Sequence, residues 1–225
     1  MTFSLVARCA NTGMFGVAIS SSSPAVAARC SFARAQIGAV ASQNITAPSL
    51  GPKLLDAISS GLAAQEAIKQ LVKDIQFAEY RQLMVVDESG STAVHSGQQT
   101  LGVWAQSCAT DVACAGNLLK NETVPESMLK AFSSFEGHLG DRLMHALKAG
   151  LIAGGEAGPV HSAGLKIVDT VSWPVADLRI DWCDECPIDA LEQLWIRYKP
   201  QLTDYVQRAL DPTMAPSYGV PGDEV

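Results

Sequence analysis

The sequence lacks the apolar segments that would place a chain in or across a membrane. No stretch reaches the roughly 18 uninterrupted apolar residues of a membrane-spanning helix. The N-terminus becomes polar at Ser4 and Arg8 and does not form the apolar core of a secretory signal peptide. We therefore expect a cytoplasmic protein with no membrane segment.

Positive charge is scarce as well. The chain carries 16 Lys and Arg against 23 Asp and Glu, which gives a net charge of −7, and its basic residues form no runs. A protein that binds nucleic acid or an anionic membrane surface usually has a basic patch, so both partners are disfavoured. A small-molecule partner fits this composition better.

Several patterns that carry known chemistry are also missing. Neither GxGxxG nor GxxxxGK[ST] occurs, and we expect no cofactor. The four histidines show no HxH or HExxH spacing; His161 stands out because it follows the glycine-rich segment 154–159, from which a mobile loop could present it to a pocket. The serine run Ser20–Ser23 lacks the GxSxG elbow. Its hydroxyls and backbone amides, with Ser22 among them, could still bind a polar substrate at a strand end.

Cysteine provides one short motif, the lone CxxC of Cys183 and Cys186. A structural zinc site needs about four ligands, usually two such pairs. Without an export signal, the six cysteines are better interpreted as reduced thiols than as a disulfide framework. We expect ordinary thiols and no bound metal, in preference to a redox or metal function of the CxxC pair.

The hydrophobic pattern predicts an α+β domain with two sheets. The first two expected strands are apolar on both faces, which suits a sheet covered on each side. Extended segments are expected at 2–9, 14–20, 35–43, 81–86, 92–95, 102–108, 112–116, 162–168 and 175–182. Helical segments are expected at 52–60, 64–72, 123–132 and 139–151, and from 187 until Pro200 breaks the helix.

This element order favours a four-layer αββα sandwich, with two mostly antiparallel sheets packed face to face and helices outside. An open doubly wound sheet is the rival, but it requires a strict βαβ alternation that the chain lacks. We predict one domain over residues 1–210. The tail 211–225, rich in proline and glycine, is expected to be loosely ordered.

Eight short segments, taken in order, resemble the family of unknown function DUF1028. The segments are 2–8, 12–18, 33–43, 81–82, 115–119, 154–155, 162–163 and 177–179, and the resemblance as a whole runs from Thr2 to about Tyr198. That family is placed with the N-terminal nucleophile (Ntn) hydrolases, whose fold is the αββα sandwich. The segment Glu156–His161 departs from the family pattern, so substrate choice is expected to differ here.

The resemblance implies that Thr2 is a catalytic nucleophile. In Ntn hydrolases the side chain of the first mature residue attacks an amide carbonyl, and the α-amine of the same residue acts as the base. An α-amine titrates near pH ~8, so part of it is free to accept a proton at neutral pH. This role requires removal of Met1, and small second residues such as threonine normally permit that removal.

The attack also needs donors for the developing oxyanion. Asn117, at the end of an expected strand, is the first candidate for this catalytic role. Gln43 and Asn44 are candidates for substrate binding because they lie in a family-like stretch. Arg81 could orient a substrate carboxylate, although a structural ion pair is an equal alternative.

Two functions remain open after this reasoning. The first is an amidohydrolase that cleaves a small amide, ureide or amino-acid derivative through Thr2. The second is a non-catalytic small-molecule-binding or scaffolding protein that keeps the Ntn-like fold. A homo-oligomer is expected from base rates, with Trp173 and Trp182 as exposed aromatic residues that could serve an interface.

Overall fold

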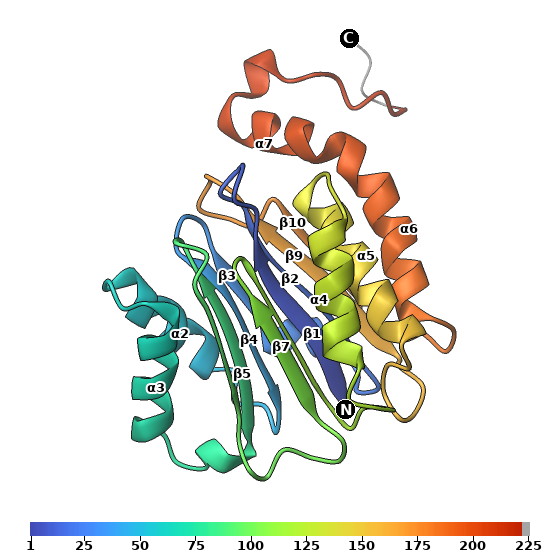
Figure 1. Ribbon diagram of the computed structural model, residues 1–225. Helices are drawn as coiled ribbons and strands as arrows, with labels where there is room; N and C mark the ends of the chain where they lie inside the picture. Colours follow the sequence, from blue (N-terminus) through green and yellow to red (C-terminus); the bar gives the residue numbers. More distant parts are fainter. Residues whose placement is uncertain (222–225) are drawn as a thin grey trace.

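The computed structural model describes residues 1–221 and shows two antiparallel β-sheets packed face to face between helices (Figure 1). The larger sheet has the order β10-β9-β2-β1-β8-β7 and the smaller one the order β3-β4-β5-β6. The strands of the larger sheet are β1 (Thr2–Arg8), β2 (Phe15–Ser21), β7 (Ala105–Ala109), β8 (Val112–Asn117), β9 (Ser162–Val168) and β10 (Ala176–Ile180). The strands of the smaller sheet are β3 (Ser31–Arg34), β4 (Gly38–Asn44), β5 (Arg81–Asp87) and β6 (Thr92–Ser96).

Helices form the two outer layers (Figure 1). The smaller sheet is covered by α2 (Leu50–Ser59) and α3 (Ala64–Asp74). The larger sheet is covered by α4 (Val124–Ser134), α5 (Leu139–Ile152) and α6 (Pro187–Tyr198). Shorter elements are α1 (Val26–Cys30), α7 (Leu202–Leu210) and the 3-10 helices η1 (Ala78–Tyr80), η2 (Lys199–Gln201) and η3 (Pro212–Met214). The predicted four-layer αββα sandwich is therefore confirmed.

The central strand β1 shows how the sequence builds both core layers. Phe3 and Leu5 are fully buried and pack against the helices, whereas Val6 packs between the two sheets. Alternate residues of a strand point to opposite faces, and both faces of β1 are covered. Burying one such side chain contributes about 1.5–3 kcal/mol. The same alternation directs Thr2 and Ser4 toward the smaller sheet.

The structure differs from the expected elements in three places. The predicted strand 35–43 is a hairpin, in which Ser31–Arg34 and Gly38–Asn44 flank a turn where Gln36 has a φ of 62°. Helix α1 was not predicted, because its five residues are too few to show helical periodicity. Strand β7 begins at Ala105 instead of residue 102, since Gly102 adopts a φ of 62° that a strand does not allow.

Near the C-terminus, Pro200 lies in η2, between α6 and α7, so it ends α6 as expected. The predicted loose tail is described only in part. Residues 212–214 form η3, and residues 222–225 lie outside the described residues. Within residues 1–221, no helix is long and apolar enough to cross a bilayer, and all six cysteines are free.

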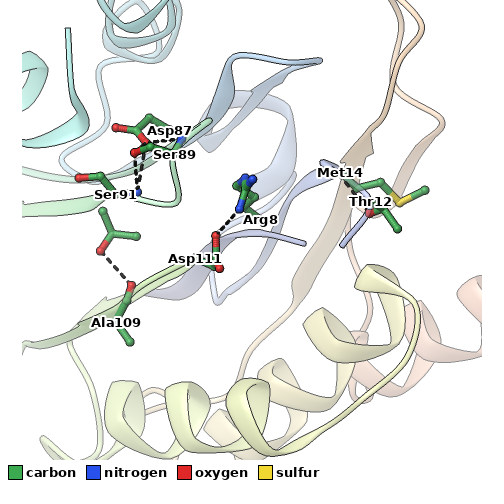
Figure 2. A network of polar contacts seen from close by, with 9 residues as sticks. Arg8, Thr12, Met14, Asp87, Ser89, Ser91, Ala109 and Asp111 are labelled. Atoms are coloured by element: carbon green, nitrogen blue, oxygen red, sulfur yellow. Dashed lines mark hydrogen bonds and ion pairs between the residues drawn. The ribbon is translucent and has the colours of Figure 1, made fainter. Parts of the chain in front are cut away.

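Polar contacts fasten the end of the sandwich that lies away from Thr2 (Figure 2). Arg8, the last residue of β1, forms an ion pair of 2.9 Å with Asp111 in the β7–β8 turn. In the β5–β6 turn, Asp87 accepts hydrogen bonds from the backbone N–H groups of Ser89 and Ser91. Because Asp111 N–H also donates to the Gly90 carbonyl at 2.9 Å, the turns of the two sheets are joined here. The opposite end is the one that carries the candidate site.

Candidate functional site

Thr2 lies in a row of polar residues that crosses the larger sheet at the end carrying the amino terminus. Thr2 pairs with Asn117 on β8, and Ser21 on β2 pairs with Ser162 on β9. On the remaining strand pair, β1 with β2, the Thr2 and Ser21 hydroxyl oxygens are 3.4 Å apart. Residues opposite one another in an antiparallel pair share a face of the sheet. The row Ser162–Ser21–Thr2–Asn117 therefore faces the smaller sheet.

The Thr2 hydroxyl is nearly buried, with 6% of the residue exposed, and Met1 covers it. Both the Thr2 and the Ser21 hydroxyls donate to the Met1 carbonyl oxygen. The Ser21 oxygen in turn accepts the backbone N–H of Ser23 at 3.1 Å. Two hydroxyl groups thus converge on the oxygen of one amide carbonyl.

A fully buried amide network faces this row from the smaller sheet. Gln43 Nε2 donates to Gln82 Oε1 at 2.8 Å, and Ser4 Oγ donates to Gln43 Oε1 at 2.6 Å. Asn117 Nδ2 donates to the same Gln82 oxygen at 3.1 Å. Asn117 Oδ1 is buried without a hydrogen-bond partner among the described residues. Since a primary amide has two N–H groups, Asn117 keeps one donor and one acceptor for a ligand.

Glu156 provides the carboxylate closest to this end of β1. It is 4% exposed, and its two carboxylate oxygens accept the Ser22 backbone N–H at 3.1 and 3.2 Å. A β-bridge with Leu119, just beyond β8, fixes its backbone. Burial raises the pKa of the Glu156 carboxyl to about 7, against the opposing effects of the positively charged amino terminus and of the hydrogen bonding with Ser22.

Asn44 and Arg81 lie on the opposite face of the smaller sheet from the network, because they alternate with Gln43 and Gln82 along their strands. Asn44 Nδ2 donates to the Tyr80 carbonyl at 2.6 Å, and Asn44 Oδ1 accepts from the Leu101 N–H at 3.2 Å. Arg81 donates to the Ile45 carbonyl. These contacts hold the loops at the rim and do not bring Asn44 or Arg81 to Thr2.

His161 is held in an aromatic stack and is not presented to the Thr2 row. Its ring stacks on Trp182 at a centroid distance of 4.4 Å, and Nδ1 lies 3.0 Å from the Cys183 carbonyl oxygen. Its backbone N–H donates to the Ser21 carbonyl at 2.8 Å. Ser22 contributes through its backbone N–H to Glu156. The structure thus brings Thr2, Asn117 and Gln43 together, with Ser22 beside them.

Two residues of this site, Gln82 and Glu156, were not named as candidates from the sequence, and Ser21 was considered only as a member of the run Ser20–Ser23. Ser21 and Gln82 are polar residues at inward positions of otherwise apolar strands, which is a detectable signal once the strand face is known. Glu156 is an isolated acid that follows two glycines within an apolar segment. Buried polar groups require hydrogen-bond partners, so each of these residues marks a polar cluster inside the otherwise apolar core.

The CxxC pair adjoins His161, the residue before Ser162 of the row. The backbone N–H of Cys183 donates to the His161 carbonyl at 2.7 Å, and Cys186 directly precedes α6. Burial raises the pKa of the Cys186 thiol. In the described part of the chain, no group of three or more His, Cys, Asp or Glu residues is placed to hold a metal ion.

A groove of about 470 Å³ between α5 and α6 has no residue of the Thr2 row in its lining.

Comparison with known proteins gives one family. The model of DUF1028, described as a family of unknown function, matches residues 2–191. No curated protein sequence matches the chain. The chain is similar to protein SPO2555 from Silicibacter pomeroyi, a structure assigned to DUF1028, with 26% identity and a TM-score of 0.85 over 92% of this chain and 94% of that one.

Two further solved structures are more distant. Anbu (ancestral beta-subunit) from Yersinia bercovieri has 9% identity and a TM-score of 0.41, over 91% of this chain and 97% of that one. The Anbu (Gly-1) mutant from Hyphomicrobium sp. strain MC1 has 11% identity and a TM-score of 0.43, over 98% of this chain and 100% of that one.

Proposed function

The chain belongs to the DUF1028 family, and from this membership and the geometry around Thr2 we propose that it is an amidohydrolase in which Thr2 is the N-terminal nucleophile. Removal of Met1 would free the Thr2 amine and the hydroxyls that now bind the Met1 carbonyl. The substrate is a small molecule with an amide, ureide or amino-acid-derived C–N bond.

The proposed reaction has two steps. The Thr2 hydroxyl transfers its proton to the Thr2 α-amine and attacks the substrate carbonyl carbon, and the leaving amine takes up this proton as the C–N bond breaks. The acyl group is then bonded to Thr2 Oγ1. Water attacks this ester with the same amine as base, which releases the carboxylic acid and restores the hydroxyl. The Ser21 hydroxyl and the remaining Asn117 N–H are the donors available for the oxyanion.

One observation carries this proposal. The hydroxyls of Thr2 and Ser21 both donate to an amide carbonyl at the first residue of the central strand, opposite Asn117 and its buried amide network. A purely structural strand end has no need for converging hydroxyls backed by a buried network.

The test compares three proteins whose intact mass shows that Met1 is absent. Wild type should hydrolyse members of a library of small amides and anilides, and Thr2→Ala should lose at least a thousandfold in kcat, since no nucleophile remains. Thr2→Ser keeps a hydroxyl in place and should retain measurable turnover. Equal turnover by wild type and Thr2→Ala would refute the role of Thr2.

A second candidate function is a non-catalytic small-molecule-binding or scaffolding protein. The Met1 carbonyl favours this function, because it accepts hydrogen bonds from both hydroxyls and would keep a substrate from them in protein that retains Met1. Under this function Thr2 is a plain strand residue, and a bound metabolite would be recovered unchanged. Mass spectrometry of the small molecules that co-purify with the native protein separates the two functions.

We further propose a cytoplasmic homo-oligomer. The acidic composition and free cysteines support the location, and the half-exposed Trp182, with 53% of its surface accessible, supports an interface. Light scattering coupled to size exclusion would give the mass of the assembly. A monomeric mass at micromolar concentration would contradict the oligomer.

A further inference from the structure

Met1 is the one group that occupies the candidate site in the structure, and its chemistry is informative. It is an α-amino acyl group whose carbonyl is bound by the Thr2 and Ser21 hydroxyls. The nitrogen and Oγ1 of Thr2 are attached to neighbouring carbon atoms, so an acyl group on either atom occupies overlapping space. Met1 therefore marks where the acyl part of a substrate would lie.

The amino terminus of Met1 acts on Glu156, as its positive charge lowers the pKa of that carboxyl. Glu156 is otherwise a buried acid without a cation. Throughout residues 1–221, no lysine, arginine or histidine side chain forms an ion pair with it, and neither does the Met1 amino group. A buried carboxylate is costly unless it is paired, and Ser22, which hydrogen-bonds Glu156, carries no charge. The site thus lacks a cation that a ligand could bring.

The Met1 side chain runs beside Gly158, in the same segment as Glu156. A Cβ atom placed on Gly158 would lie 3.7 Å from the Met1 terminal methyl group, which is ordinary van der Waals contact. The segment is anchored to the end of β8, since Ala157 N–H donates to the Leu118 carbonyl at 2.9 Å. This segment therefore borders the side chain of the acyl group and carries the carboxyl whose pKa the Met1 amine lowers.

We propose that the Thr2 site accepts amides of α-amino acids with a free ammonium group, and that Glu156 binds that ammonium. This inference rests on the proposed function and names its substrate class. The acyl carbonyl takes the place of the Met1 carbonyl between Thr2 and Ser21, and an unbranched side chain takes the place of the Met1 side chain beside Gly158. Hydrolysis then yields a free amino acid and an amine.

The direct test uses Thr2→Ala protein freed of Met1, because this variant binds without turnover. Isothermal titration compares L-methioninamide with 4-(methylthio)butanamide, which has the same shape without the amine. We expect methioninamide to bind at least tenfold more tightly at pH 8. Equal affinities, or no binding of methioninamide, would overturn the proposal, and this comparison needs no variant of Glu156.

A second titration identifies the carboxylate. The Glu156→Gln substitution is added to the Thr2→Ala protein, and it keeps the shape of the side chain and an acceptor for Ser22. It should weaken the binding of methioninamide at least tenfold and change the affinity for the amine-free amide by less than twofold. Glu122→Gln, a change of an exposed acid in the loop between β8 and α4, is the matched control and should change the binding of neither amide. An equal effect of Glu156→Gln on both amides would mean that Glu156 serves the Thr2 amine instead, and would overturn its role in substrate binding.

Turnover by Met1-free wild type separates the two proposals. Selective binding of methioninamide without hydrolysis of any amino-acid anilide would refute the amidohydrolase and leave the ammonium site standing. Hydrolysis of methionine p-nitroanilide and its amine-free analogue at equal kcat/KM would support the amidohydrolase and refute the ammonium site.

Discussion

Replacement of Glu156 by glutamine should stabilise the protein at neutral and alkaline pH. Burial raises the pKa of this carboxyl from 4.5 to about 7 in the folded chain. The folded state therefore holds a proton that the unfolded state has already lost between these two values, and the free energy of unfolding falls as pH rises through this interval. At about 1.4 kcal/mol for each pKa unit, the wild type loses about 3 kcal/mol by pH 8.

The assay is urea unfolding of wild type, Glu156→Gln and the exposed-site control Glu122→Gln at pH 5, 6, 7 and 8. The other titrating groups are common to all three proteins and cancel in the differences. We expect the advantage of Glu156→Gln over wild type to grow by about 2.5 kcal/mol from pH 5 to pH 8, while Glu122→Gln stays parallel to wild type. A Glu156→Gln difference that is constant with pH would refute the assignment of a buried, unpaired carboxyl.

Three further predictions concern the framework around the site. Gln82→Leu removes the acceptor shared by Gln43 and Asn117, and the stranded buried donors should cost about 2–4 kcal/mol in chemical denaturation; a loss below 0.5 kcal/mol would contradict the network. Gly140→Ala places a Cβ 2.3 Å from the Trp195 ring and should cost about 1–3 kcal/mol, whereas an unchanged unfolding midpoint would show that α5 and α6 can separate freely. Asp111→Asn keeps a residue that tolerates the φ of 69° but removes the charge paired with Arg8, so calorimetry should find Tm lower by about 1–4 °C; an unchanged Tm in low salt would mean that this pair contributes nothing.

The architecture was accessible from the sequence because each layer leaves a periodic signal. Strands β1 and β2 are apolar on both faces, so the sheet needs a packed layer on each side. The order of strands and helices then left the αββα sandwich as the simplest packing. The hairpin of β3 and β4 was not predicted from the sequence. Its turn depends on Gln36 adopting a left-handed conformation, which glutamine does not signal.

The site was predictable only in part, because its geometry depends on strand register. Thr2 was named from the family resemblance and Asn117 from its position at the end of an expected strand, and the structure pairs them across β1 and β8. Ser21 was passed over in favour of Ser22, because a one-residue difference in register decides which serine faces inward. Glu156 could not be placed at all, since only the tertiary bridge to Leu119 brings its loop to the amino terminus.

Arg81 and Asn44 show the opposite outcome. Both lie in a family-like stretch and both are polar, yet they alternate with the inward-facing Gln82 and Gln43 and bind the loop carbonyls of Ile45 and Tyr80. A polar residue at a strand end is informative about a site only when its face is known. The next residue in the sequence points to the opposite face of the sheet and can contact only the neighbouring loops.

The central claim concerns the state and reactivity of Thr2, and one intact-mass measurement tests it. Protein isolated from its native host turns over a methionine ester or anilide, and the reaction is quenched with acid. The intact mass of the protein is then measured, and peptide mapping locates the adduct. The account predicts a chain without Met1 that carries an acyl group on Thr2, and no adduct on the Thr2→Ala variant. Quantitative retention of Met1, or an equal adduct on the variant, would contradict it.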